Sequence, residues 1–276
     1  MAGLYISSNI SAMQTASELD QTTNLLQAAM QQLSTGLRIN KAADDAAGMA
    51  ITSMMGNVID GMNQANINIQ NGINAIQTAD SAESQINTIL GRMQTLANEA
   101  ANSTLTTADR VDIQHEINQL IMDINSISTS TKFNGVRLLT GAFSSTAYKV
   151  QYGAYSSNQF NITLSAVNAK TLNVSSVCVS QITSALAAIG SIQHAVSSLA
   201  ITRANLGAYQ NGLQYLSNNL QTSLQNLTAS QAAIQDTDVA TEMAQYTQLQ
   251  ILQQSGTAML AQANALPQAA LSLIKG

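Results

Sequence analysis

The chain has 276 residues, of which 9% are charged, and its formal net charge is −5. This balance argues against nucleic acid as a main partner, because phosphate binding needs a basic patch. With one proline, no tryptophan and three phenylalanines, the composition favours long uninterrupted helices over compact α/β domains.

The first predicted helix runs from Tyr5 to about Gly36, and apolar residues recur along it at helical spacing. Its apolar stripe is narrow, and Gln, Asn, Ser and Thr cover the other faces, so the helix needs a partner. Gly36 is a natural stop, because glycine adopts the left-handed C-cap conformation without a steric cost.

The middle of the chain predicts two further helices. The first, from about Asp45 to Ala101, is very long by the standards of globular domains. Thr106–Asp109 then has the pattern of a capping box, with Asp in place of the more usual Glu. It introduces a helix to about Ser128 whose apolar residues have the most regular heptad spacing in the chain. Asn134-Gly135 marks a turn.

Between residues 142 and 177, aromatic and β-branched residues alternate with polar ones, which predicts a β-hairpin or two. Helix resumes at about Gln181, breaks near residues 236–238, and continues to Leu266 and beyond. The simplest way to bury the apolar stripes is to pair the first helix with the last and to bundle the inner helices. We therefore expect a mainly α fold, a long antiparallel helical bundle or coiled coil with paired terminal helices and a small β-hairpin insert.

The candidate catalytic and metal sites in the sequence are incomplete. Asp44 and Asp45 are adjacent, so on a helix they would point in different directions, and no His or Cys lies near them. His115-Glu116 begins like the zinc-protease motif HExxH, but Gln119 stands where the second His is needed. We predict no enzyme, no metal site and no cofactor, and we interpret the paired aspartates as part of a specific contact.

The sequence also argues against a membrane. It has no run of about 18 apolar residues, and its N-terminus lacks the basic leader and apolar core of a Sec signal. Interfacial helices present Lys and Arg, whereas residues 1–37 have neither, and Lys275 is the only basic side chain after Arg203. Protein contacts are therefore favoured for the terminal helices. Subunits that bind a different surface of their neighbour form a helix unless they close into a ring, which suggests polymerisation.

Three long stretches and the opening segment carry a resemblance to a known family. They are LSTGLRINKAADDAAGMAI at Leu33–Ile51, TKFNGVRLLTG at Thr131–Gly141, QILQQSGTAMLAQANALPQAALSLI at Gln250–Ile274, and YISSNISAM from Tyr5. Together they resemble both terminal regions of the bacterial flagellins, and these regions make up well over half of the chain.

The resemblance implies the subunit of a bacterial flagellar filament, exported through the flagellar type III channel without a cleaved Sec signal and located outside the cell. The implied partners are further copies of the chain in a helical homopolymer, an export chaperone, the filament cap, hook-junction proteins and a vertebrate innate immune receptor. The implied division is residues 1–40 and 236–276 for the N- and C-terminal helices of the filament-core domain, 41–141 and 181–235 for the inner helical domain, and 142–180 for a short β-rich central segment.

The resemblance also assigns residues to subunit contact and assembly. In the N-terminal signature these are Leu33, Gly36, Arg38, Ile39, Asn40, Asp44, Asp45 and Gly48. In the inner helices and the turn they are Arg92, Leu96, Glu116, Asn134, Gly135 and Arg203. In the C-terminal signature they are Leu252, Gln254, Leu260, Gln262 and Asn264. Arg92, Leu96 and Glu116 align with positions that contact both the neighbouring subunit and the immune receptor in many flagellins.

Some residues depart from the family pattern. Gly212 stands where the family commonly has Arg, which places a glycine inside a helix at a cost of about 1 kcal/mol relative to Ala. Gly91 and Thr95 replace the usual Gln and Glu of the receptor-facing patch. The alternatives to a filament subunit are a hook–filament junction protein, a flagellin-like surface adhesin and a coiled-coil bundle that does not polymerise.

Overall fold

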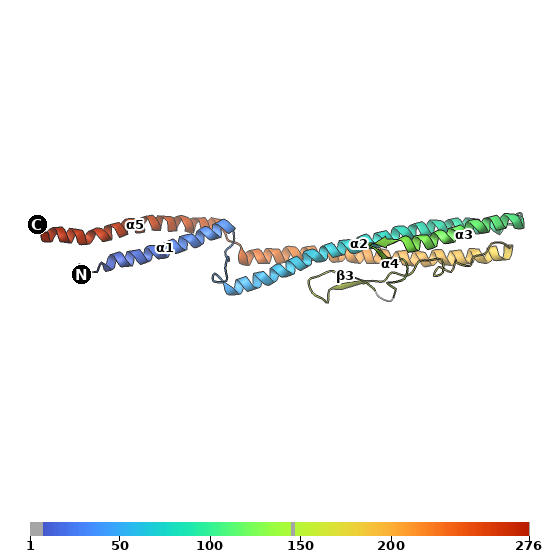
Figure 1. The fold of residues 1–276 in the computed structure, drawn as a ribbon, viewed down its shortest axis with the longest axis horizontal. Coiled ribbons are helices and arrows are strands. Elements are labelled where there is room, and N and C mark those ends of the chain that lie inside the picture. Colours follow the sequence, from blue (N-terminus) through green and yellow to red (C-terminus); the bar gives the residue numbers. More distant parts are fainter. Residues whose placement is uncertain (1–7, 145–146, 276) are drawn as a thin grey trace. The chain divides into compact units, whose positions relative to one another are not determined.

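The computed structural model describes residues 8–144 and 147–275, with the side chains of the last helix described up to residue 265. Helices make up most of the chain (Figure 1). The elements are α1 (Ile10–Thr35), α2 (Ala46–Ala100), α3 (Thr107–Ser130), β1 (Lys132–Phe133), β2 (Val136–Arg137), β3 (Tyr148–Gln151), β4 (Gln159–Ile162), α4 (Ile182–Gln235) and α5 (Val239–Lys275). The mainly α fold with a small β insert is confirmed.

The chain forms two compact units. The first consists of the residues up to Asn57 together with those from Asn226 onwards, and the second is Val58–Gln225. The first unit therefore holds α1 and α5, and the second holds α3, both small sheets and the greater part of α2 and α4.

Both ends of α1 are capped by residues suited to that task. The side chain of Asn9 accepts a hydrogen bond from the backbone N–H of Ala12 at 3.1 Å. At the other end Gly36 has a φ of +74°, so the predicted stop at this glycine is confirmed. The helix begins at Ile10, because the Asn9 side chain occupies the N-cap position. Tyr5 itself lies outside the described residues.

In the first unit, α1 packs beside α5 (Figure 1). The buried residues Leu26 and Ala29 of α1 meet Leu249 of α5, and Tyr246 packs against them. Closer to the chain termini, the side-chain amide of Asn9 donates a hydrogen bond to the carbonyl oxygen of Ala263 at 2.7 Å. The predicted pairing of the first helix with the last is confirmed.

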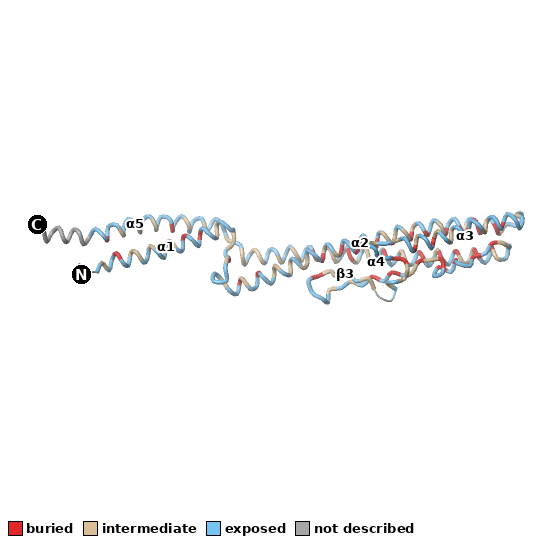
Figure 2. Tube along the Cα trace, viewed as in Figure 1, coloured by how far each residue is buried: buried red, intermediate tan, exposed pale blue. Residues whose placement is uncertain are grey.

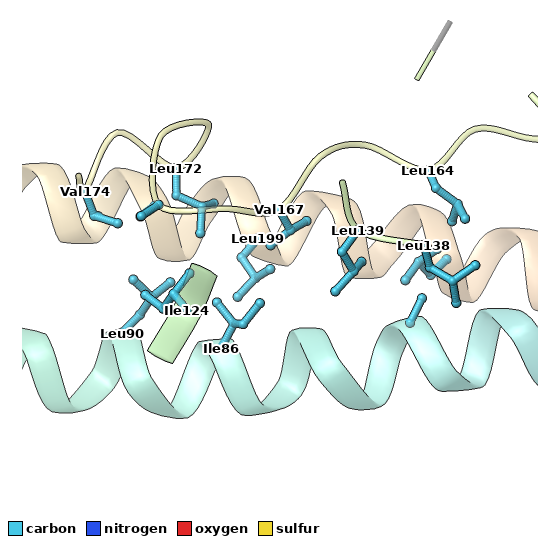
Figure 3. Close-up of a cluster of buried hydrophobic side chains, with 14 of the residues drawn as sticks. Ile86, Leu90, Ile124, Leu138, Leu139, Leu164, Val167, Leu172, Val174 and Leu199 are labelled. Carbon is cyan, nitrogen blue, oxygen red and sulfur yellow. The ribbon is translucent and has the colours of Figure 1, made fainter. Parts of the chain in front are cut away.

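The larger core lies in the second unit. Ile86 and Leu90 of α2, Ile124 of α3 and Leu199 of α4 converge there and are fully buried (Figure 3). Ile117 and Ile124 are one heptad apart on α3, so the heptad pattern of this helix does face the core, as predicted.

The junction between α2 and α3 is held by side chains that bind backbone groups. Asp109 accepts a hydrogen bond from the backbone N–H of Thr106 at 2.8 Å, and the Thr106 hydroxyl accepts one from the N–H of Asp109 at 3.3 Å, which confirms the capping box. Arg110 is 6% exposed, and its guanidinium donates to the carbonyl oxygens of Ala100 and Asn102 at 2.8 Å. It therefore satisfies the carbonyl of the last residue of α2 and binds a second carbonyl in the turn that follows.

Two small antiparallel sheets follow α3. β1 and β2 are joined at Asn134 and Gly135, whose φ angles of +48° and +79° suit a tight hairpin turn. The β3–β4 hairpin pairs Tyr148 with Ile162 and Gln151 with Gln159. One hairpin therefore lies within residues 142–177, as predicted, and the other lies before them, around the predicted turn.

Residues 163–181 are irregular, although apolar and polar residues alternate along much of them. Leu164, Val167 and Val174 of this segment point into the core (Figure 3). Side chains of α3 satisfy part of its backbone: the N–H of Ala169 donates to Asn125 Oδ1 at 3.1 Å, and that of Val179 to Gln114 Oε1. The alternation of apolar and polar residues therefore arises because one side of this segment faces the core, although the segment pairs with no strand among the described residues.

α4 contains a window that is long and apolar enough to cross a membrane, judged by length and composition only. The sequence pattern predicted no such segment, because polar residues interrupt every apolar run in this helix. A helix packed in a bundle can be as apolar as one that crosses a membrane. In α4 the apolar residues that pack in the core include Ala188, Ile192 and Leu199.

Candidate assembly surface

The two breaks in the helical chain lie side by side in the first unit. The backbone N–H of Arg38 donates to the carbonyl oxygen of Gln235 at 2.7 Å, and that of Thr237 to the carbonyl oxygen of Gly36 at 3.0 Å. Leu37 and Asp236 form an antiparallel bridge between these bonds. We call residues 36–45 and 236–238 together the paired break.

Polar side chains of the N-terminal signature support the paired break from within the same chain. The Arg38 guanidinium donates to the carbonyl oxygen of Ile234, and the Asn40 amide donates to that of Leu37 at 2.8 Å. Arg38 is otherwise exposed and Asn40 is half-buried. Arg38 therefore satisfies a backbone carbonyl in the last turn of α4, and Asn40 satisfies one in the segment that follows α1.

The adjacent aspartates act as two separate caps. Asp44 Oδ2 accepts hydrogen bonds from the backbone N–H groups of Asn40 and Lys41, each at 3.0 Å. Asp45 Oδ1 accepts one from the N–H of Gly48 at 2.9 Å and so caps the start of α2. The two carboxylates serve different backbone segments, which accounts for the pair without a catalytic or metal role.

Asp238 gives α5 the same kind of start. Its Oδ1 accepts from the N–H of Ala240 at 3.0 Å, and its Oδ2 accepts from the Thr241 hydroxyl at 3.0 Å. The Thr241 hydroxyl and the backbone N–H groups stabilise the ionised carboxylate, which lowers the pKa of Asp238 below its ordinary value.

Large apolar side chains along α1 and α5 are exposed among the described residues, and Figure 2 marks many residues of these helices as exposed. On α1 the large exposed ones are Ile10, Met13, Leu25 and Met30, and on α5 they are Val239, Met243, Ile251, Leu252 and Met259. We call these nine residues the open apolar surface. One of them, Leu252, is also a predicted C-terminal contact residue and is 48% exposed. Of the other predicted C-terminal residues, Leu260 is half-buried, and Gln254, Gln262 and Asn264 are exposed.

The predicted contact residues of the second unit are divided between its surface and its interior. Arg92 and Glu116 are exposed and form an ion pair, with Nη2 2.7 Å from Oε1. Leu96 is 2% exposed and packs in the core of the second unit. Arg203 Nε donates to Asp80 Oδ1 at 2.8 Å, and this hydrogen bond, together with the field of Asp80, raises the pKa of Arg203.

The remaining predicted residues lie in the N-terminal signature and the turn. Leu33 is half-buried near the end of α1, and Ile39 is 1% exposed. Asn134 and Gly135 are exposed at the tip of the β1–β2 hairpin. The geometry therefore gathers most of the predicted residues of the N-terminal signature at the paired break.

Both ends of the sequence match known regions of one family. Residues 6–144 match the bacterial flagellin N-terminal helical region, and residues 189–274 match the bacterial flagellin C-terminal helical region. The chain belongs to the bacterial flagellin family. The prediction of a structural protein rather than an enzyme is thereby confirmed.

Two relatives are similar to this flagellin over its whole length. The flagellar filament 33 kDa core protein of Treponema phagedenis is 38% identical, and a flagellin of Halalkalibacterium halodurans is 37% identical; each match covers 99% of this chain and 100% of the relative. A solved structure assigned as a flagellar hook-associated protein of Vibrio parahaemolyticus has a TM-score of 0.57 at 14% identity, covering 70% of this chain and 100% of that one. At this identity the match shows a similar fold and gives no information on function. The hook-junction alternative is not favoured, because the relatives that match over the whole length are flagellins and filament core proteins.

Sequence reasoning missed the packing role of two glycines that contact the β3–β4 hairpin of this flagellin. A Cβ at Gly72 of α2 would lie 2.9 Å from Val150 Cγ2, and one at Gly212 of α4 would lie 3.1 Å from Phe160 Cζ. Gly212, which departs from the family pattern, therefore leaves room for the aromatic ring of the insert. The sequence contains the glycines, but the strand residues above them become neighbours only in the folded chain.

Proposed function

We propose that this flagellin is the structural subunit of a bacterial flagellar filament used for swimming, and that it polymerises chiefly through α1 and α5. The open apolar surface carries this proposal. In the subunit, the pair α1–α5 buries a small cluster around Leu26 and Leu249, while larger apolar side chains such as Met13 and Met259 remain exposed. Several large apolar side chains exposed along one pair of helices are typical of a protein interface.

The charge distribution on these helices also suits burial between identical subunits. Between Ser8 and Leu37 the charged residues are Glu18 and Asp20, and between Val239 and Ile274 the charged residue is Glu242. Burying such surfaces removes few charges from water, which is the costly part of burying polar surface. The abundant Gln and Asn side chains can both donate and accept hydrogen bonds across the contact.

We infer that the N-terminal signature acts in assembly mainly from inside the subunit. The hydrogen bonds of Arg38, Asn40, Asp44 and Asp45 at the paired break support this inference, as does the burial of Ile39. In this view these residues fix the directions in which α1 and α5 leave the paired break. Arg92 and Glu116 are exposed and are available to a neighbouring subunit or to an innate immune receptor.

The family resemblance supports the finer parts of the proposal. The chain would be exported by the flagellar type III route without a cleaved Sec signal and would act outside the cell. Its other partners would be an export chaperone, the filament cap and the hook-junction proteins. Residues 1–40 and 236–276 would form the filament core, 41–141 and 181–235 the surrounding helical layer, and 142–180 the outer segment.

Electron microscopy of the purified full chain, beside a chain that ends at Gln250, tests the role of α5. The shorter chain keeps Leu249 and hence the buried cluster with α1, but it loses most of the open apolar surface of α5. We expect filaments from the full chain and soluble monomers from the shorter one. Filaments from both chains would contradict the assignment to the terminal helices, and filaments from neither would contradict self-assembly.

A further inference from the structure

Glu83 of α2 lies inside the second unit and is 2% exposed. A buried carboxylate is costly unless a cation or several hydrogen-bond donors compensate its charge. Arg203 on α4 is the cation whose charge acts on Glu83. Its guanidinium, however, already forms an ion pair with Asp80, with Nε 2.8 Å from Oδ1. Glu83 therefore lacks an ion-pair partner of its own among the described residues.

The hydrogen-bond partner of Glu83 is the hydroxyl of Thr202 on α4. Thr202 Oγ1 lies 2.9 Å from Glu83 Oε2 and 2.8 Å from the carbonyl oxygen of Leu199. A threonine hydroxyl has one hydrogen, whereas an ionised carboxylate and a carbonyl are both acceptors. The Thr202 hydrogen cannot fully satisfy both of them at once.

A proton on Glu83 resolves this conflict. The protonated carboxyl donates its O–H to Thr202 Oγ1, and the Thr202 hydroxyl donates to the carbonyl oxygen of Leu199, so both short contacts become hydrogen bonds. The chain Glu83–Thr202–Leu199 then links α2 to α4 without a buried charge. Loss of the proton leaves a charge in the core and one acceptor without a full hydrogen bond.

We propose that Glu83 is a buried proton switch in the contact between α2 and α4, which is firm when Glu83 holds its proton and loosens when the proton is lost. Burial raises the pKa of Glu83 from its ordinary 4.5 to about 7, although the Thr202 hydrogen bond lowers it. Of the charged groups that the structure describes around Glu83, Asp80 on its own helix raises this pKa, and Arg203 on α4 lowers it. The pKa therefore agrees with the switch that the hydrogen-bond geometry indicates.

The direction of the pH effect follows from the raised pKa. The folded chain holds the proton more tightly than the unfolded chain, so the extra stability is fully present below pH 4.5 and is lost as the pH rises through about 7. Between pH 6.0 and pH 8.5, ionisation of Glu83 alone would increase the unfolding equilibrium constant about tenfold.

Urea unfolding of the monomeric full chain at pH 6.0 and pH 8.5, followed by circular dichroism, tests the switch. The variant Glu83→Gln keeps the size of the side chain and has no charge to gain, so we expect its unfolding constant to change about tenfold less between the two pH values than that of the wild type. The matched control is Glu99→Gln, which alters an exposed glutamate on the same helix. A Glu83→Gln variant with the pH dependence of the wild type would overturn the proposal.

A second measurement does not depend on the folding of a variant. In the wild-type chain with ¹³C-labelled glutamate, the side-chain carboxyl carbons report the titration of each glutamate in the folded protein. We expect one glutamate to titrate near pH 7, apart from the others. If every glutamate of the folded wild type titrates below pH 6, the proposal is wrong.

Discussion

Ile39 lies so close to Gly48 that any side chain at position 48 would force it to move. A Cβ at Gly48 would lie 2.6 Å from Ile39 Cδ1 and 2.5 Å from Asp45 Oδ2, which are both shorter than a van der Waals contact. Because Gly48 has no side chain, it leaves room for the buried side chain of Ile39 and for the Asp45 cap of α2. The N-terminal signature therefore has a structural reason within a single subunit.

Replacing Gly48 with alanine tests this packing. We expect Gly48→Ala to destabilise the chain by about 1–3 kcal/mol, because the added methyl group displaces Ile39 or breaks the Asp45 cap. The matched control is Gly91→Ala on the same helix, where a Cβ meets nothing within 4 Å. The control should stabilise the chain by up to about 1 kcal/mol, since alanine is the better helix former. Urea unfolding followed by circular dichroism measures both effects, and equal effects would contradict the packing argument.

The close contact between the β3–β4 hairpin and Gly72 of α2 gives a second prediction. A Cβ at Gly72 would lie 2.9 Å from Val150 Cγ2 and 3.3 Å from Leu213 Cδ1. We expect Gly72→Ala to cost about 1–2 kcal/mol and to speed hydrogen exchange in β3 and β4. Gly207→Ala, at a site with open space around it, should leave this exchange unchanged. If exchange in the hairpin is the same in all three chains, the hairpin does not rest on Gly72.

The capping box of α3 predicts a loss of stability in acid. The backbone N–H and the hydroxyl of Thr106 lower the pKa of Asp109, so the stability from this carboxylate is present above its ordinary pKa of 3.8 and is lost as the pH falls through the lowered value. Asp109→Asn should therefore weaken the acid dependence of unfolding. Thr106→Ala should cost about 0.5–2 kcal/mol at neutral pH through the lost cap. Unfolding curves from pH 2 to pH 7 measure both changes. If the stability of Asp109→Asn falls in acid as steeply as that of the wild type, the Asp109 carboxylate does not contribute to the acid dependence.

The open apolar surface predicts polymerisation defects without unfolding. In the double variant Leu252→Asn, Met259→Gln, we expect filament mass after sedimentation to fall at least tenfold, because polar groups would be buried without set partners. Circular dichroism of the monomer should not change, since both residues are exposed. Tyr155→Ser, an equally exposed change in the β3–β4 loop, serves as the control and should polymerise normally. If the double variant forms normal filaments, Leu252 and Met259 do not lie in the interface between subunits.

The exposed ion pair of Arg92 and Glu116 separates a role inside the subunit from a role between subunits. Such pairs stabilise a protein by about 0–1 kcal/mol, so neither Arg92→Glu nor Glu116→Arg should change monomer unfolding by more than that. If the pair serves a neighbouring subunit, both single variants and the charge-swapped double variant should assemble poorly, because each presents the wrong charge outward. Full recovery of assembly in the swapped variant would instead assign the pair to the subunit alone.

Local signals in the sequence predicted the parts of the fold that depend on a few neighbouring residues. Gly36 ends α1 and Thr106–Asp109 caps α3, because both devices are complete within one turn of the chain. The pairing of α1 with α5 was also predictable, since two apolar stripes at opposite ends of the chain needed cover.

Other features depend on contacts between distant parts of the chain. The role of Glu83 comes from Thr202, which is 119 positions away, and the irregular path of residues 163–181 depends on Gln114 and Asn125 of α3. The predicted contact residues were harder still to place, because one chain does not contain the neighbour that would reveal them. Leu96 is an example: its place in the apolar pattern of the long helix agrees with its burial, whereas its contact role was implied by the family resemblance and stays a prediction.

The scarcity of charge on α1 and α5 has a consequence for how filaments respond to their surroundings. An interface made of methionine, leucine and amide side chains has little Coulomb attraction for salt to screen, so the lowest protein concentration that supports filaments should barely change with ionic strength. Apolar association weakens on cooling, because its driving force near room temperature is entropic. Cooling, rather than added salt, should therefore be the gentle way to return such filaments to monomers.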